Sequence, residues 1–357
     1  MKRCSKLLAI CLGSGKENIL RRFKRLMKLL PKQAGEFVAK NAKNVKVLTP
    51  GIINICNKIK DSLSDGSFRP DALYLHQYPH PSEPTEEAVE WLFVADLLNF
   101  SFWMPDGSHY TVTHNGVKYT GYLALTAALT RAVESGIPIT SAYYYSQIDR
   151  KVLMRILEAD DHCPPIPLFE ERYSSLVSAG KTLMEKFGGK FSNILKEADN
   201  SALKLCDLVI SHFLTFEDEA LYKEQRVCIW KRVQILTADI WGLFHGKGLG
   251  YFKDIDEITM FADYRVPQVL MYFGCMEYSQ ELRSKLEEGQ ELPNGSEDEV
   301  EIRGCSIHAI ELVKEELRRS GILLNSATID FFLWDYRRKF AEELKKIPFH
   351  RTRCIYY

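Results

Sequence analysis

The stretch that decides the fold is Trp241-Gly-Leu-Phe-His-Gly-Lys-Gly-Leu-Gly250, together with Phe261-Ala-Asp-Tyr-Arg-Val-Pro-Gln268 a short distance beyond it. Helical patterns over 225–243 and 255–262 flank the first segment, and a further helix is predicted over 266–273. The glycines permit a tight turn between two helices. They can also present backbone amides to an anion, but their spacing is not that of a P-loop.

The order of these elements carries more information than the glycines alone. A helix, a glycine-containing hairpin turn, a second helix and then an Asp is the order in helix-hairpin-helix DNA glycosylases, which the segment Gln234–Gly274 resembles. In those enzymes an Asp supports cleavage of an N-glycosidic bond, and Asp263 stands in the corresponding place. The resemblance implies a helical fold and a carboxylate-assisted reaction. A helix end followed by a turn explains the glycines of 241–250 equally well.

The rest of the chain predicts a mainly α fold with a small β-hairpin or sheet element. The hairpin is expected over Tyr110–Thr120, because Asn115-Gly116 favours a type I′ turn between alternating flanks. Thr85 is expected to cap a helix that runs to Phe102. We expect residues 31–357 to form one compact domain, with a boundary near Pro165 as the alternative. Further helices are predicted over 33–41, 51–63, 123–134, 147–159, 168–187, 201–215, 277–288, 300–319 and 329–345.

Composition favours a soluble protein that binds a small ligand. Lys plus Arg and Asp plus Glu each number 47 in 357 residues, so the formal net charge is zero. A protein that binds duplex nucleic acid through many phosphates normally has a basic excess, although balanced charge leaves room for a local basic patch. The nine cysteines form no Cys-x-x-Cys pair, which indicates reduced thiols in the cytoplasm or a similar compartment. No apolar run approaches the roughly 20 residues of a membrane span.

The first thirty residues differ from the rest of the chain. They are rich in Lys, Arg and Leu, Glu17 is their only acid, and Pro31 follows them. A mitochondrial transit peptide has this basic, amphipathic character. A basic extension or a solvated first helix is the other interpretation, so we expect a cytoplasmic protein with a mitochondrial location as the alternative.

Two segments place carboxylates among aromatic and apolar residues: Phe261–Gln268, which contains Asp263, and Asp330-Phe-Phe-Leu-Trp-Asp-Tyr336. A carboxylate in such surroundings is costly to desolvate unless something pairs with it. An acid at a helix start, or one paired with Arg265 or Arg337, would account for a single segment. Two of them favour an acid-lined aromatic pocket for a flat heterocyclic ligand.

The acids of the second segment need a particular arrangement to share that pocket. Asp330 and Asp335 are rotated by roughly 140° on one helix, so they converge most easily if Asp330 is the N-cap. The aromatic residues around the acids could then enclose a base, or they could simply be core. These residues are Phe261, Phe331, Phe332 and Trp334.

The predicted chemistry is cleavage of a bond between a ribose anomeric carbon and a base nitrogen. This reaction develops oxocarbenium character on the sugar, which a carboxylate can stabilise, attack or supply with water. A second carboxylate can hold the donor edge of the base. Among the histidines, His76 in a loop rich in Pro and Tyr is the candidate ligand contact. Metal-ligand spacing is absent, so no metal and no other cofactor is expected.

From about residue 31 onward the chain closely resembles the queuosine salvage proteins, the queuosine 5′-phosphate N-glycosylase/hydrolase family. The two acidic segments above belong to the matching strings. The others are Trp91-Leu-Phe-Val-Ala-Asp-Leu-Leu-Asn-Phe-Ser-Phe-Trp103, Gly136-Ile-Pro-Ile-Thr-Ser141, Glu185-Lys-Phe-Gly-Gly189, Glu299-Val-Glu-Ile-Arg-Gly-Cys305 and Pro348-Phe-His-Arg-Thr-Arg-Cys-Ile-Tyr-Tyr357. The resemblance implies hydrolysis of queuosine 5′-phosphate to queuine and ribose 5-phosphate, which returns the base for tRNA modification.

The resemblance also implies the site residues. Phe261 and Asp263 follow from Phe-Ala-Asp-Tyr-Arg, Asp330 and Asp335 from Asp-x-x-Leu-Trp-Asp, and His76 from the preceding Leu-His. Asp263 and Asp335 are the expected catalytic pair. The expected substrate contacts are His76, Phe261, Asp330 and Phe331.

Two further expectations concern substrate contacts. Phe331 stands where many members have Tyr, so stacking is kept and any hydrogen bond from that hydroxyl is lost. Lys247 with nearby amides, or Arg265, is expected to hold the phosphate.

Two other function classes remain open from the sequence. One is a nucleic-acid-binding protein or DNA-repair glycosylase on the same helical scaffold. The other is a non-catalytic helical protein in which the acids only cap helices. Direct contact with duplex nucleic acid is not expected, and the sequence does not determine the oligomeric state.

Overall fold

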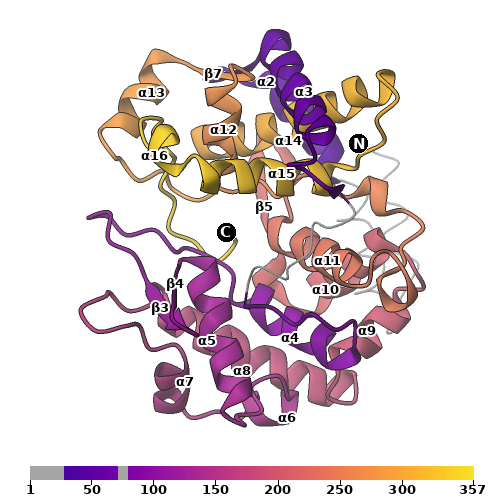
Figure 1. Ribbon diagram of the computed structural model, residues 1–357, viewed down its shortest axis with the longest axis vertical. Helices are drawn as coiled ribbons and strands as arrows, with labels where there is room; N and C mark the ends of the chain where they lie inside the picture. The colour runs from indigo at the N-terminus through magenta and orange to yellow at the C-terminus, as the bar shows by residue number, and fades with distance from the viewer. Residues whose placement is uncertain (1–27, 71–78) are drawn as a thin grey trace, which may run out of the picture.

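The computed structural model describes residues 28–70 and 79–357, and over these the fold is mainly α, as predicted. Two halves lie one above the other in Figure 1, and segments from both ends of the described chain build the upper one. We call this upper half the terminal half. It contains α2 (Pro31–Asn41), α3 (Thr49–Ser64), α12 (Val266–Tyr272), α13 (Gln280–Glu287), α14 (Glu297–Arg319), α15 (Ser326–Lys339) and α16 (Ala341–Leu344).

The lower half, here the central half, comes from the middle of the chain. It contains α4 (Glu86–Leu97), α5 (Tyr122–Glu134), α6 (Ala142–Tyr145), α7 (Arg150–Ile156), α8 (Phe169–Lys186), α9 (Phe191–Glu197), α10 (Ala202–His212) and α11 (Lys231–Leu243). Each half has its own cluster of buried apolar side chains. None of the helices in the described ranges is long and apolar enough to cross a membrane.

Short strands hold distant parts of the chain together. The predicted hairpin is confirmed as β3 (Thr111–His114) and β4 (Val117–Thr120), with the turn at Asn115-Gly116. Two further sheets were not predicted. In one, β6 (Gln225–Cys228) lies between β1 (Lys28–Leu29) and β5 (Glu219–Tyr222); in the other, β2 (Val45–Val47) pairs with β7 (Met276–Tyr278).

The close contact between α2 and α14 organises the terminal half. Gly304 lies against Val38, and a Cβ atom added at Gly304 would stand 2.5 Å from Val38 Cγ1. Gly35 lies equally close to Ile307, since an added Cβ would stand 2.7 Å from its Cγ2. The absence of side chains at these two glycines therefore lets the helices approach. On α14, Arg303 in turn contacts the carbonyl of Ala262, the residue before Asp263.

Several predicted element limits are wrong, and tertiary contacts explain the largest differences. The helix predicted over 225–243 begins only at Lys231, because 225–228 pairs as β6. The helix predicted over 255–262 is a single 3₁₀ turn, Ile255–Glu257, followed by extended chain. The helix predicted to reach Phe102 ends at Leu97, and the buried Arg172 guanidinium donates to the carbonyls of Leu98 and Phe100 just beyond it.

Only the last three residues of the predicted basic extension, 28–30, are among the residues that the structure describes. Residues 1–27 lie outside the described residues, whereas Lys28 and Leu29 form β1 and belong to the fold. The Lys28 ammonium also pairs with the Glu219 carboxylate at 2.5 Å. The folded part therefore begins no later than Lys28.

Candidate active site

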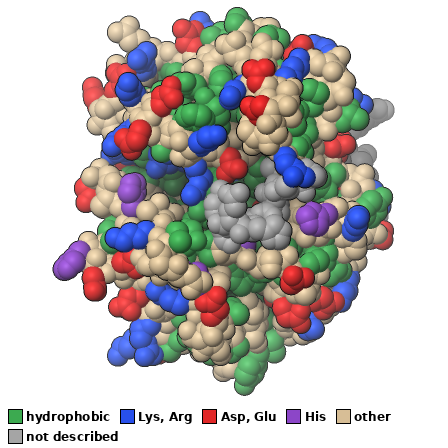
Figure 2. Space-filling model, in the orientation of Figure 1, with side chains coloured by type: hydrophobic (Ala, Val, Ile, Leu, Met, Phe, Trp, Pro, Cys, Tyr) green, Lys and Arg blue, Asp and Glu red, His purple; other side chains and the backbone are tan. Residues whose placement is uncertain are grey.

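A cavity of about 560 Å³ lies where the two halves meet, and both halves line it. The central half contributes the start of α5 and one face of α11, where Lys231, Ile235 and Asp239 follow one another at successive turns. The terminal half contributes the extended segment before α12 and one side of α15. Figure 2 shows several Lys and Arg side chains at mid-height on this face, at the boundary between the halves.

The structure brings five of the six predicted site residues to this one cavity: Phe261, Asp263, Asp330, Phe331 and Asp335. His76 lies outside the described residues. Segments about 70 positions apart in the sequence thus converge, as the two acidic segments predicted. Their convergence does not by itself assign a role to each residue.

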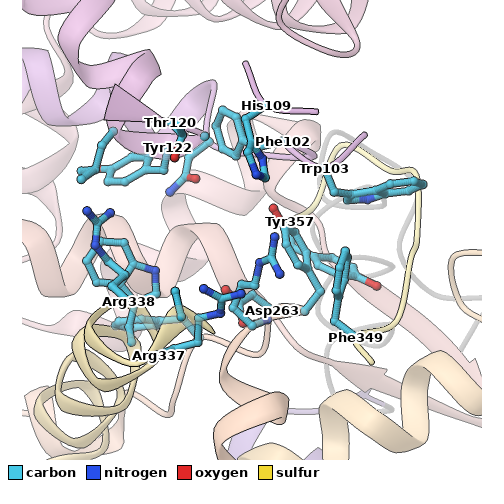
Figure 3. A pocket seen from close by; sticks show the side chains of 18 of the residues that line it. Phe102, Trp103, His109, Thr120, Tyr122, Asp263, Arg337, Arg338, Phe349 and Tyr357 are labelled. Atoms are coloured by element: carbon cyan, nitrogen blue, oxygen red, sulfur yellow. The ribbon is translucent and has the colours of Figure 1, made fainter. Parts of the chain in front are cut away.

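Asp263 is held in place by the backbone at the start of α12. Its Oδ1 accepts hydrogen bonds from the amides of Arg265 at 2.7 Å and Val266 at 2.9 Å. The interpretation of this acid as a helix-start residue is therefore correct, and Asp263 lines the cavity as well. In Figure 3 Asp263 lies near the centre of the view with Arg337 close to it. The two backbone bonds fix the orientation of the carboxylate toward a ligand.

Asp330 is the most buried of the three predicted acids, with 3% of its surface exposed. It is not the N-cap that the sequence suggested, because Asn325 caps α15 by accepting from the Thr328 amide at 2.8 Å. Asp330 Oδ2 accepts from the Phe261 amide at 3.1 Å, which ties the two acidic segments together. Burial, aided by repulsion from the Asp263 carboxylate, raises the pKa of Asp330 well above its usual range.

The aromatic residues divide between the cavity and the core. Phe261 and Phe331 meet edge to face with ring centroids 5.6 Å apart, and both line the cavity, as does Trp334. Phe332 instead packs against Phe68 in the core of the terminal half, so the core alternative holds for this ring. Asp335 is solvent-exposed at the cavity edge. The site therefore combines apolar ring faces with one buried acid, Asp330, and one exposed acid, Asp335.

Cationic side chains line the same cavity: Arg265, Arg337, Arg338, Lys345, Arg351 and Lys231. Burial, together with the nearby Arg265 guanidinium, lowers the pKa of Arg337 to about 10. Burial also lowers the pKa of His109, as do the charges of Arg265 and Arg337. This mutual repulsion indicates a region of positive potential that favours an anion. Of the two predicted phosphate contacts, Arg265 lines the cavity and Lys247 does not.

The lining residues that the sequence analysis did not single out include His80, Lys231 and Asp239. His80 lies between aromatic rings, and its Nε2 is 3.1 Å from the Tyr122 hydroxyl. Burial lowers the pKa of His80 to about 3 and raises that of Asp239 well above its usual range. In the sequence, only the spacing of Lys231 and Asp239 indicated that they belong to one site, because residues eight positions apart lie on the same side of a helix. Among the described residues, no group of His, Cys, Asp and Glu is placed to hold a metal ion.

Asp96 on α4, behind the cavity wall, provides a test of these electrostatics. It is fully buried, its Oδ2 has no hydrogen-bond partner, and burial raises its pKa to about 7. An acid with a raised pKa stabilises the folded state at low pH and loses that contribution as the pH rises toward the folded-state pKa. Asp96→Asn should therefore stabilise the protein by about 2–3 kcal/mol more at pH 8 than at pH 5.

Urea unfolding of the wild-type protein and of the Asp96→Asn variant, each at pH 5 and pH 8, measures this difference in the free energy of unfolding. A matched substitution of the exposed acid Asp106→Asn should show no such pH-dependent gain, because hydrogen bonds from Ser108 lower the pKa of Asp106. An equal effect of Asp96→Asn at pH 5 and pH 8 would contradict the assignment.

Comparison with known proteins agrees with this geometry. The family model described as queuosine salvage protein matches residues 79–357. A mouse protein named queuosine 5′-phosphate N-glycosylase/hydrolase is 43% identical over 92% of this chain and 99% of its own length. Proteins of the same name from Schizosaccharomyces pombe (36% identical; 91% of this chain, 99% of its own length) and Sphaerobacter thermophilus (38%; 78% and 84%) also match. The chain therefore belongs to the queuosine salvage protein family.

Proposed function

We propose that this protein hydrolyses the N-glycosidic bond of queuosine 5′-phosphate and releases queuine for reuse in tRNA modification. The observation that carries the proposal is the convergence of Asp263, Asp330 and Asp335 with Phe261 and Phe331 on one cavity. The relatives that share most of the chain carry the name of this activity. The cavity volume of about 560 Å³ lies within the range of small-molecule sites.

Asp263 and Asp335 act on the sugar. As the bond between the anomeric carbon and the base nitrogen breaks, positive charge develops on the ribose, and a fixed carboxylate stabilises it. One acid of the pair faces that carbon, and the other directs water to it and accepts the water proton. Asp263 suits a fixed role because two backbone amides orient it, whereas Asp335 at the exposed edge has access to water.

The two ends of the substrate go to different parts of the cavity. The flat base lies against Phe261 and Phe331, with its donor edge toward the buried Asp330. The 5′-phosphate lies toward Arg265 and Arg337, because a half-buried cluster of cations favours an anion. These guanidinium groups supply the positive charge that a phosphate needs, so the arrangement fits a nucleotide better than a free base.

The role of Asp330 predicts a proton released on binding. Its raised pKa favours the protonated form of the free carboxyl, while the N–H donors of the base favour the ionised form. Queuine binding should therefore release a proton, and affinity should rise with pH until the pH exceeds the pKa of free Asp330. Calorimetry in two buffers of different ionisation enthalpy measures the release. Asp330→Asn should abolish it, and a wild-type heat that is independent of buffer would contradict this role.

Incubating the purified protein with queuosine 5′-phosphate tests the proposed function directly. Free queuine and ribose 5-phosphate should appear in equal amounts, and unphosphorylated queuosine should react more slowly because the guanidinium contacts are lost. Release of base from duplex DNA or tRNA, with none from the nucleotide, would instead support a nucleic-acid glycosylase. Absence of any product with all four of these substrates would leave a non-catalytic protein.

A further inference from the structure

Lys231 is a buried cation that the reaction described above does not use. It is the first residue of α11, only 6% of its surface is exposed, and it lines the cavity. Its amide donates to Asp218 Oδ2 at 3.1 Å, and the preceding amide of Trp230 donates to the Asp218 carbonyl at 3.2 Å. Asp218 is itself paired with Arg303 at 2.6 Å. The backbone at Lys231 is thus fixed by a buried network.

The Lys231 ammonium has charged neighbours but no ion pair within 4 Å to any carboxylate of the described residues. Burial lowers its pKa, while the carboxylates of Asp263, Asp96 and Asp330 raise it. The adjacent Arg232 is directed elsewhere, since its guanidinium donates to the carbonyls of Leu97, Asp96 and Thr215. A buried ammonium without a close partner is costly, so this arrangement suits an acceptor supplied by a ligand.

The base proposed for this site offers such an acceptor. A 7-deazaguanine carries a carbonyl oxygen directly beside its donor edge. Asp330, which we assign to the donor edge, and Lys231 line the same cavity and attract each other electrostatically. A cation and a carboxylate in one cavity can match an acceptor and two donors that lie side by side on a base. The pair therefore matches the edge of the base as a unit.

We propose that Lys231 is a catalytic residue that donates to the carbonyl oxygen of the base and stabilises the base as a leaving group. The proposal rests on the proposed function. When the glycosidic bond breaks, its electron pair moves to the base, which leaves as an anion with charge spread onto that oxygen. A 7-deazapurine lacks the ring nitrogen whose protonation otherwise helps a purine to leave. The Lys231 charge lowers the energy of the anion, which then takes a proton from solvent while water adds to the sugar.

Replacing Lys231 with Met tests the proposal by its dependence on the leaving group. Lys231→Met should lower kcat for queuosine 5′-phosphate by about 10²–10³-fold, as loss of a donor to a developing anion does. 4-Nitrophenyl β-ribofuranoside 5-phosphate releases a stable anion without help, so its loss should stay below about 10-fold. Lys231→Arg, which keeps the charge, should recover part of the natural activity. Lys253→Met, an exposed lysine outside the cavity, serves as the matched control.

A binding measurement tests the role of Lys231 even if the protein does not hydrolyse the nitrophenyl substrate. Lys231→Met should weaken 7-deazaguanine binding by about 10-fold, because one hydrogen bond to a charged donor is lost. It should leave 2-amino-7-deazapurine, which has no carbonyl oxygen, unaffected. Equal losses for both bases, or for both substrates, would make Lys231 merely structural and overturn the proposal. Failure of the wild-type protein to release queuine would instead refute the proposed function.

Discussion

Asp263→Asn should retain the fold and lose about 10²–10³-fold or more in kcat for queuosine 5′-phosphate. Asn caps helices as well as Asp does, so the hydrogen bonds to the amides of Arg265 and Val266 can persist. What disappears is the negative charge, and with it the stabilisation of the ribosyl cation. Thermal unfolding and steady-state release of queuine measure the two effects separately.

Asp254 provides a matched control for this substitution. It also accepts backbone hydrogen bonds at a helix start, from the amides of Ala202 and Leu203, but it does not line the cavity. Asp254→Asn should leave kcat unchanged. If Asp263→Asn remained fully active while folded, Asp263 would be a helix cap and nothing more. If Asp335→Asn abolished turnover and Asp263→Asn did not, Asp335 on α15 would be the acid whose negative charge the reaction needs.

Arg303→Met should destabilise the protein by about 3–5 kcal/mol, because it leaves two buried carboxylates without their cation. Arg303 is 1% exposed and donates to Asp218 at 2.6 and 2.9 Å and to Glu299 at 2.9 Å. It also donates to the Ala262 carbonyl at 2.8 Å and lies over the Tyr357 ring. Arg303 thereby joins the central half, through Asp218, to α14 and to the residue that precedes Asp263.

Urea unfolding measures the loss, and a triple variant separates its causes. Adding Asp218→Asn and Glu299→Gln to Arg303→Met removes the unpaired charges and should restore part of the stability. The exposed pair of Arg283 and Glu287 supplies the control, since Arg283→Met should cost less than about 1 kcal/mol. A similarly small loss for Arg303→Met would show that the buried network contributes little to folding.

The acidic segments were predictable because their local chemistry is unusual. Asp263 and Asp330 stand among aromatic residues, and the cost of desolvating an acid there pointed to a shared pocket before any contact was known. For Lys231 and Asp239 the only sequence signal is their spacing, because their neighbours are not unusual. The helix that carries them is buried on several sides and contains further buried polar residues, Arg232 and Gln234, so no polar face marks the cavity.

The errors in the predicted fold involve both long-range and local contacts. The strand over 225–228 forms a hairpin with Glu219–Tyr222 directly before it, and residues 28 and 29, far away in the sequence, pair with its other edge. The helix ending at Leu97 stops where Arg172, more than 70 residues later, donates to two carbonyls just beyond it. Asn325 rather than Asp330 begins α15, since Asn is an equally good cap and binds the Thr328 amide. The helix-hairpin-helix resemblance stays a prediction.

A crystal structure with bound queuine tests the central claim most directly. The deazaguanine ring should lie against Phe261 and Phe331, with its donor edge within hydrogen-bond distance of Asp330 and its sugar-bearing nitrogen facing Asp263 and Asp335. Queuine bound elsewhere on the surface, with this cavity filled only by solvent, would contradict it.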